Sequence, residues 1–249
     1  MDIFFELHRD IPREGPGDNA STRKAYALLT GLPERPRLLD IGCGPGMQTI
    51  ELAKISAGSI LAVDTHQPFL DELARRTDQE GLIKRITTLN KSMFELDFEP
   101  GSFDVLWSEG AIYIIGFEKG LQEWKPFLKE GGYLAVTELA WLKPDPPADP
   151  KFFWDENYPG MKTLEENLVI FRGAGYREIS HFVLPESSWW DDYYTPLEKR
   201  IVMLSEKYRN DEEAMALLRE SQCESDLYRK YSDWYGYVFY IMQYKEETD

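Results

Sequence analysis

Cysteine and histidine are scarce in this sequence. Its 249 residues include only two cysteines and three histidines. Cys43 and Cys223 are too few for a disulfide framework, and together with His8, His66 and His181 they match no common zinc-binding spacing. We therefore expect no metal site and no structural disulfide. Such cysteine usage is typical of proteins of the reducing cytoplasm.

Long hydrophobic runs are also missing. No stretch approaches the roughly 18 apolar residues that a membrane-spanning helix needs. The first ten residues, MDIFFELHRD, lack the basic start and the apolar core of a signal peptide. These absences predict a cytoplasmic protein without a membrane segment.

Basic residues are outnumbered by acidic ones. Lys and Arg total 28, whereas Asp and Glu total 44, so the formal net charge is −16. This excess disfavours sequence-independent nucleic-acid binding, which depends on clustered Lys and Arg, and equally disfavours docking on an anionic membrane. We expect a small-molecule substrate, with a cation or an amine as one option. The pattern does not indicate an oligomeric state.

The composition otherwise favours a folded α/β protein. Hydrophobic residues make up 43% of the chain, which argues against disorder, and the length suits a single domain. Short apolar runs alternate with helical patterns over the first 140 residues, and this alternation predicts a parallel sheet covered by helices on both faces. The strands are expected at 37–42, 59–64, 86–89, 103–108 and 133–137, and the helices at 47–55, 68–77 and 118–128.

The second part of the chain is richer in aromatic residues. Four prolines between residues 143 and 150 predict a loop. A helix at 163–174 should lead into a strand at 176–184, with a final strand at 234–244. The helical, aromatic-rich stretch at 189–231 is too short to hold a core of its own. We therefore interpret it as an insertion between the last two strands.

The strongest motif is the sequence LLDIGCGPG, which runs from Leu38 to Gly46. A glycine-rich turn between a strand and a helix lets the backbone approach a ligand closely. Asp64 ends the second predicted strand. An acidic residue there can accept hydrogen bonds from both ribose hydroxyls of an adenine nucleoside.

The spacing of this motif discriminates between two cofactors. The dinucleotide fingerprint requires a small residue at position 47, which is Met47, whereas the third glycine here is Gly46. Asp40, just before the turn, would repel a pyrophosphate but can accept the amino group of a methionine moiety. An NAD(P)-dependent oxidoreductase is therefore the weaker alternative, and glycines that serve only a tight turn are a third.

This G-x-G-x-G variant resembles motif I of class I S-adenosylmethionine-dependent methyltransferases, and the resemblance extends over residues 29–137. The pattern is most similar to the ubiquinone/menaquinone-biosynthesis-like, small-molecule branch. It implies a Rossmann-like α/β sheet of seven strands in the order 3-2-1-4-5-7-6, with strand 7 antiparallel. It also implies one domain over 1–249, with a cap segment at 1–30, a cofactor-binding core at 31–140 and a helical insertion at 185–232 over the active site.

The resemblance assigns cofactor-binding residues to the ends of the first four strands. It places Ser92 and Met93 beside the adenine, and Ser108 and Glu109 near the point of methyl transfer. The helix at 19–29, capped by Asp18 or Ser21, belongs to the segment expected to fold over the cofactor. The full cofactor-binding set is Asp40, Gly42, Cys43, Gly44, Gly46, Asp64, Thr65, Ser92, Met93, Ser108 and Glu109.

Three residues are candidates for contact with the substrate. Glu109 follows the fourth strand, although it can equally bind the cofactor or stabilise the turn. Tyr113 can orient a polar group of the substrate or pack in the core, and His181 can act in catalysis or fill a structural place in the sixth strand. A general base is required only if the acceptor must lose a proton.

Aromatic residues offer a wall for a cationic substrate, because indole rings attract cations. The candidates are Trp141, Trp154, Trp189 and Trp190, with core packing as the alternative role for each. The sequence thus predicts an S-adenosylmethionine-dependent methyltransferase acting on N or O of a small molecule, with S-adenosylhomocysteine as product. A protein that binds either compound without turnover is the alternative.

Overall fold

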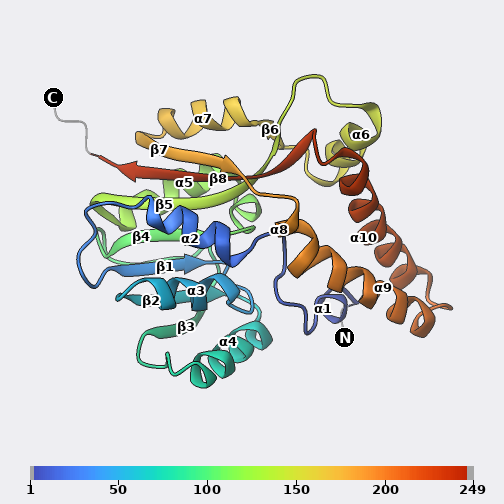
Figure 1. Ribbon diagram of the computed structural model, residues 1–249, viewed down its shortest axis with the longest axis horizontal. Helices are drawn as coiled ribbons and strands as arrows, with labels where there is room; N and C mark the ends of the chain where they lie inside the picture. The colour runs from blue at the N-terminus through green and yellow to red at the C-terminus, as the bar shows by residue number, and fades with distance from the viewer. Residues whose placement is uncertain (1–2, 246–249) are drawn as a thin grey trace.

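One mixed β-sheet organises the protein (Figure 1). The computed structural model describes residues 3–245; residues 1–2 of the predicted cap, and residues 246–249, lie outside the described part. The strands are β1 (Arg37–Ile41), β2 (Ser59–Asp64), β3 (Ile86–Asn90), β4 (Phe103–Ser108), β5 (Leu128–Trp141), β6 (Lys162–Thr163), β7 (Tyr176–Val183) and β8 (Tyr235–Tyr244). Their order is β3-β2-β1-β4-β5-β8-β7, and the short β6 pairs with β5.

The predicted topology is confirmed. β8 runs antiparallel to both β5 and β7, whereas β1 to β5 are parallel neighbours. Thus β7 and β8 are the sixth and seventh strands of the expected 3-2-1-4-5-7-6 order. The two-residue β6 is an addition that the sequence pattern did not indicate.

Helices cover both faces of the sheet and extend beyond one end of it (Figure 1). They are α1 (Ile3–Leu7), α2 (Asn19–Ala27), α3 (Met47–Ile55), α4 (Gln67–Gln79), α5 (Phe117–Trp124), α6 (Ala148–Asn157), α7 (Leu164–Gly173), α8 (Ser187–Trp189), α9 (Thr195–Lys207) and α10 (Glu212–Tyr231). Shorter helical turns are η1 (Ile112–Ile114), η2 (Lys125–Phe127) and η3 (Trp190–Tyr194). Within residues 3–245, no helix combines the length and the apolarity needed to cross a bilayer.

The two faces of the sheet carry separate hydrophobic clusters because side chains alternate along each strand. In β1, Leu38 belongs to the cluster under α2, α3 and α4, whereas Leu39 and Ile41 belong to the cluster under α5 and α7. All six residues of β4 are buried. A central parallel strand covered on both faces is expected to show such a continuous pattern.

A third cluster joins the insertion to the N-terminus. It includes Leu7 of α1, Leu139 of β5, Trp189 of α8 and Leu197 of α9. Figure 1 shows α9 and α10 beyond the strand ends, with α1 beside α9. The predicted helical insertion is therefore part of the same body as the sheet, and it packs against the cap segment.

Some boundaries differ from the predicted ones for physical reasons. The predicted loop at 143–150 ends at Pro147, because α6 begins at Ala148. The fifth strand extends well beyond 133–137, since β8 pairs with it from Tyr133 to Trp141. Asp18 rather than Ser21 caps α2, because its carboxylate accepts the Ser21 backbone N–H at 2.7 Å.

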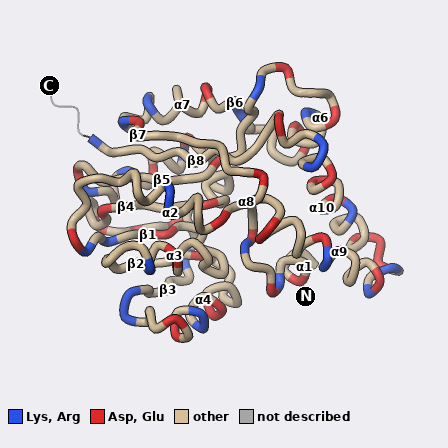
Figure 2. Tube along the Cα trace, viewed as in Figure 1, with Lys and Arg blue, Asp and Glu red and all other residues tan. Residues whose placement is uncertain are grey.

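Charged residues of both signs are interspersed along the whole trace (Figure 2). Many acids pair with neighbouring bases at the surface, as in the Lys119–Glu123 and Lys151–Asp155 pairs. Exposed pairs of this kind contribute about 0–1 kcal/mol each. The net charge of −16 is therefore mostly a property of the solvated surface, and only a few acids lie near a cavity.

Candidate functional site

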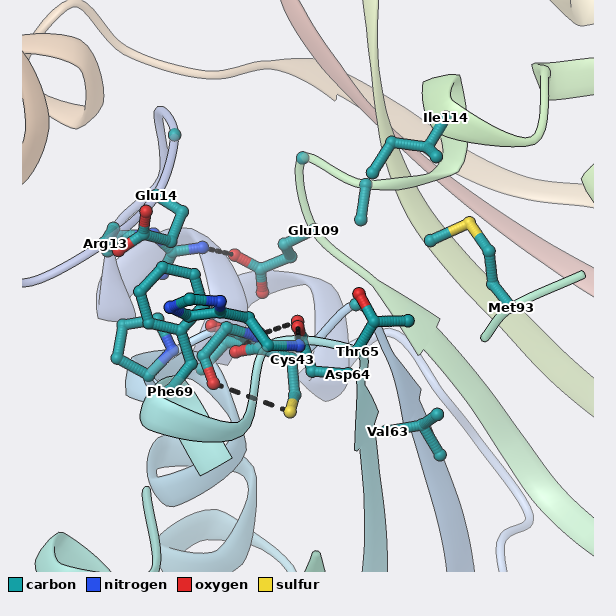
Figure 3. A pocket seen from close by; sticks show the side chains of 18 of the residues that line it. Arg13, Glu14, Cys43, Val63, Asp64, Thr65, Phe69, Met93, Glu109 and Ile114 are labelled. Carbon is teal, nitrogen blue, oxygen red and sulfur yellow. Dashed lines mark hydrogen bonds and ion pairs between the residues drawn. The ribbon is translucent and has the colours of Figure 1, made fainter. Parts of the chain in front are cut away.

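A cavity of about 330 Å³ lies at the carboxyl ends of β1, β2, β3 and β4 (Figure 3). Ligands bind at this edge in open parallel sheets, because loops and helix N-termini converge there. Eight of the predicted cofactor-binding residues line the cavity. They are Gly42, Cys43, Gly44, Asp64, Thr65, Ser92, Met93 and Glu109.

The glycine-rich turn forms one wall of this cavity. Gly42, Gly44 and Gly46 have φ angles of 74°, 53° and 82°, a region that glycine adopts without strain. The N–H groups of Gly42 and Cys43 both donate to the Val63 carbonyl, at 2.8 and 3.0 Å. These bonds hold the turn against the end of β2 and leave its other side open to the cavity.

Gly42 is expected to tolerate no side chain. A Cβ there would lie 2.4 Å from Ala111 Cβ, in addition to the left-handed strain. Gly101 is the matched control because it has a similar φ of 66° and open space around it. Gly101→Ala should lower the free energy of unfolding by about 1–2 kcal/mol. Gly42→Ala should lower the free energy of unfolding by about 1–3 kcal/mol more than Gly101→Ala does, because the added methyl group overpacks the turn. Urea titrations measure both values. Equal losses for the two variants would contradict the close contact between Gly42 and Ala111.

Gly46 does not line the cavity. A Cβ at this position would lie 2.2 Å from Leu73 Cδ1 of α4. The third glycine of the motif therefore allows α3 and α4 to pack closely. The motif spacing placed it among the cofactor-binding residues, whereas the structure gives it a packing role.

Asp64 lies at the end of β2 and lines the cavity. Its carboxylate accepts the Gly44 N–H and the His66 N–H, each at 2.9 Å. A carboxylate offers about four lone-pair sites, so it can still accept two hydroxyl groups. Asp64 therefore both fixes the glycine turn and presents acceptor capacity to a ligand.

Asp40 lies beneath the turn and outside the cavity lining. It is fully buried, and its carboxylate accepts the Thr49 hydroxyl at 2.6 Å and the Gln48 amide at 3.3 Å. Burial raises the pKa of Asp40 to about 7. Gln48 lines the cavity, so Asp40 orients a lining residue. Direct contact between Asp40 and a cofactor stays a prediction.

Two further walls come from the segments that follow β3 and β4 and from α4 together with the N-terminal segment. Met93 and Ile114 lie on one side of the cavity, and Phe69 and Glu14 on the other (Figure 3). The Phe5 ring of α1 stacks on His66, with centroids 3.8 Å apart. An apolar slot with a few polar groups suits the flat ring of a nucleoside.

Glu109 links the cap to the sheet. Its carboxylate forms a buried salt bridge with Arg13 at 2.6 Å, and it accepts the Thr22 hydroxyl at 2.7 Å and the Trp107 indole N–H at 2.8 Å. The two charged side chains are 4% and 1% exposed. With both oxygens engaged, Glu109 acts as the anchor of residues 3–18. Of the roles that the sequence offered, this arrangement corresponds to structural support of the turn and the cap; contact of Glu109 with a cofactor or a substrate stays a prediction.

The other residues that the sequence proposed for contact with substrate or cofactor do not all lie at the cavity. Tyr113 lines the cavity. His181 lies on β7 at the far side of the sheet, where its Nδ1 is 2.7 Å from the Glu178 carboxylate, and it is not among the lining residues. Ser108 is buried, and its hydroxyl donates to the Ile41 carbonyl at 2.9 Å. It does not line the cavity either.

Sequence reasoning missed the lining residues contributed by the cap. Phe5, Arg13 and Glu14 lie far from the motif in sequence, and no local spacing marks them. The sequence offered only an indirect indication that this segment belongs to the site, namely the glycine-rich stretch before the capped helix α2. Both carboxylate oxygens of Glu14 are buried and have no hydrogen-bond partner within residues 3–245.

A second cavity, of about 240 Å³, adjoins the first. It lies between the sheet, α6 and the helices of the insertion. Five residues line both cavities: Phe4, Glu14, Gly15, Gly110 and Tyr113. The two cavities are therefore direct neighbours under the cap. The Trp154 and Trp189 rings line the second cavity, whereas Trp141 and Trp190 do not.

The chain is similar to proteins whose family is established. Residues 38–132 match the model of a methyltransferase domain family. The uncharacterized methyltransferase YodH of Bacillus subtilis is 30% identical over 175 residues, which cover 69% of this chain and 72% of that protein. The sterol 24-C-methyltransferase erg6 of Aspergillus fumigatus is 23% identical over 184 residues. That match covers 67% of this chain but only 46% of the sterol enzyme.

A solved structure agrees over nearly the whole chain. It is a methyltransferase from Thiobacillus denitrificans in complex with S-adenosyl-L-homocysteine, with a TM-score of 0.83 and 21% identity, covering 98% of this chain and 99% of that one. This likeness concerns the fold. With the YodH match and the glycine-rich turn, it leads to one conclusion: the chain belongs to the class I S-adenosylmethionine-dependent methyltransferase family.

Proposed function

We propose that the protein transfers a methyl group from S-adenosylmethionine to a nitrogen or oxygen atom of a small molecule. One observation carries the proposal: a cavity at the glycine-rich turn adjoins an aromatic cavity under the cap, and the two share five lining residues. The first has the features of a nucleoside site and the second those of a site for a small organic molecule. Their shared border, lined by Glu14, Gly110 and Tyr113, is where two ligands would meet.

The residues of the first cavity fit S-adenosylmethionine. Gly42 and Gly44 open the turn, Asp64 keeps spare acceptor capacity, and Met93 and Ile114 supply apolar walls. The buried oxygens of Glu14 have no hydrogen-bond partner within residues 3–245, so they can face a cationic ligand. When bound, S-adenosylmethionine supplies a methyl group activated by a positively charged sulfur.

The protein contributes alignment and the exclusion of water. Residues 3–18 cross over both cavities and are held at several points. Arg13 pairs with Glu109, Lys207 pairs with Glu6 at 2.6 Å, and Gly17 donates to the Ser188 carbonyl at 2.9 Å. Orientation of reactants in a closed site can supply a large part of a rate enhancement.

Calorimetric titration with S-adenosylhomocysteine tests the cofactor assignment directly. We expect stoichiometric binding with a dissociation constant in the micromolar range or below, and no comparable binding of NADH. Folded protein that produces no binding heat with S-adenosylhomocysteine would refute the proposal. Enhanced NADH fluorescence on mixing would instead support an oxidoreductase.

Transfer itself is tested separately, because a cofactor site reports binding and not turnover. The protein is incubated with methyl-labelled S-adenosylmethionine and a panel of small amines, alcohols and phenols. Label in any acceptor supports the proposed transferase. Cofactor binding without transfer to any member would favour the non-catalytic alternative.

A further inference from the structure

We propose that the second cavity binds a small organic cation, a protonated or quaternary amine. The inference deepens the proposed function: a protonated amine bound here would be the methyl acceptor once one of its N–H protons has passed to a lining carboxylate, Glu14 or Glu224, and the freed nitrogen lone pair displaces S-adenosylhomocysteine from the methyl carbon. A quaternary amine has no such lone pair and would bind here without accepting a methyl group at nitrogen. It rests on three features of the cavity: its aromatic walls, the carboxylates that face or back it, and the lack of a basic residue among the described side chains that line it.

Aromatic rings form a large part of the walls. Trp154 comes from α6, Trp189 from α8, Tyr193 from the turn that follows it, and Tyr237 from β8. Trp189 is 1% exposed and stacks on Tyr228, with centroids 4.0 Å apart. A ring held this rigidly offers its free face at little entropic cost. Aromatic faces attract organic cations by about 0.5–2 kcal/mol each, more when water is excluded.

Two carboxylates, from segments far apart in the sequence, line the cavity. Glu14 lies at the border with the first cavity, and both its oxygens are buried without a partner in the described chain. Glu224 comes from α10 and accepts the Tyr194 hydroxyl at 2.8 Å. Burial together with the nearby Asp64 raises the pKa of Glu14 to about 8, and burial likewise raises the pKa of Glu224.

A third carboxylate lies directly behind the wall. Glu138 of β5 is 2% exposed and accepts the Tyr158 hydroxyl at 2.5 Å, whereas its other oxygen has no partner within residues 3–245. Burial raises the pKa of Glu138 to about 8. An unpaired buried carboxylate is costly to ionise. A cation in the cavity offsets this cost for all three acids.

No positive charge of the protein competes for these acids inside the cavity. Among the described lining residues there is neither Lys nor Arg. His8 lines the cavity, but burial lowers its pKa, and its Nδ1 lies 2.9 Å from the Phe4 carbonyl. Arg13 of the cap is paired with Glu109, and Arg76 of α4, whose charge partly offsets the raised pKa of Glu14, does not line this cavity. The described lining therefore holds no Lys or Arg that could stabilise the ionised form of these acids, and a cationic ligand would supply that charge.

Choline and its neutral isostere 3,3-dimethyl-1-butanol test the proposal, because they differ in charge and hardly in shape. Each is titrated into the full chain saturated with S-adenosylhomocysteine, and binding is followed by calorimetry and by the fluorescence of the tryptophans. Tetramethylammonium and ethanolamine, measured in the same way, extend the test to a bare quaternary ion and to a protonated primary amine. We expect at least one of the three cations to bind about tenfold tighter than the neutral isostere.

Two matched variants locate the site. Glu224→Gln removes one charge from the cavity lining, whereas Glu220→Gln removes the same charge from an exposed position on the same helix. Glu224→Gln should weaken cation binding about tenfold and leave the affinity for S-adenosylhomocysteine unchanged. Glu220→Gln should change neither the affinity for the cation nor the affinity for S-adenosylhomocysteine.

The outcomes separate this proposal from the function on which it rests. Binding of all three cations no tighter than that of the isostere, or equal effects of the two variants, would overturn the cation site. If S-adenosylhomocysteine still binds in that case, the cofactor assignment stands and only the substrate class fails. Failure of S-adenosylhomocysteine to bind would instead contradict the proposed function.

Discussion

Exchanging Glu109 for glutamine is expected to lower the free energy of unfolding by about 3–5 kcal/mol. The exchange leaves the Arg13 guanidinium buried without its counter-charge, while the hydrogen bonds from Thr22 and Trp107 can persist. An uncompensated buried charge is far more costly than the loss of a surface pair. Urea unfolding followed by circular dichroism measures the change.

The matched control is Glu123→Gln. Glu123 pairs with Lys119 at 3.6 Å, and both side chains are about half exposed. Removing this pair should change the free energy of unfolding by no more than about 1 kcal/mol. If the two variants lose similar stability, Glu109 is not the anchor that its burial indicates.

A double variant separates charge burial from simple loss of contact. Arg13→Met combined with Glu109→Gln removes both charges, so no unpaired ion remains inside. It should recover part of the stability lost in the single variant. Tryptic cleavage after Arg9 should be faster in the single variant than in the native chain, because residues 3–18 lose their attachment. Unchanged cleavage would show that α9 alone holds the cap.

Replacing Asp64 with alanine is expected to weaken S-adenosylhomocysteine binding about 100-fold. Two hydrogen bonds from hydroxyl groups to a carboxylate are worth about 3 kcal/mol together, which corresponds to this factor. The variant also removes the acceptor for the Gly44 and His66 N–H groups, so the turn loses support. Calorimetric titration of the folded variant gives the dissociation constant.

Asp78→Ala is the control for this variant. Asp78 lies on α4, is exposed and does not line the cavity. Its replacement should leave the dissociation constant unchanged within about twofold. Asp64→Asn is an intermediate case, because the amide keeps one acceptor oxygen but loses the charge. Its dissociation constant should lie between that of Asp64→Ala and that of the native protein. A loss of less than about threefold for Asp64→Ala would refute the ribose assignment.

The glycine-rich motif shows which features a sequence can reveal. It lies within a few residues of a strand and a helix, so local spacing alone placed Gly42 and Gly44 at a turn between the two, and in the structure both glycines line a cavity. The same spacing could not distinguish Gly46, whose role depends on Leu73 of a different helix. Asp40 likewise required the tertiary structure, because its burial by Thr49 and Gln48 is not visible in the motif.

The anchor between Arg13 and Glu109 illustrates the opposite case. The two residues are 96 positions apart, and no periodicity or motif connects them. The aromatic residues of the second cavity come from α6, α8, β8 and the turn between α8 and α9. Composition indicated that the second part of the chain was aromatic. Only packing separated Trp154 and Trp189, which line the cavity, from Trp141 and Trp190, which do not.

The sequence by itself determined the class of fold and the place of the glycine-rich turn, and the family resemblance supplied the order of the strands. The fold class and the turn follow from local patterns: alternation of strands and helices, a run of glycines after a strand, and an acid at the end of the next strand. The tertiary structure alone decided which acids are surface charge and which line a cavity. Burial and partnership depend on contacts between distant segments, and those contacts make Glu109 an anchor and leave Glu14 without a partner among residues 3–245, at the border of the two cavities.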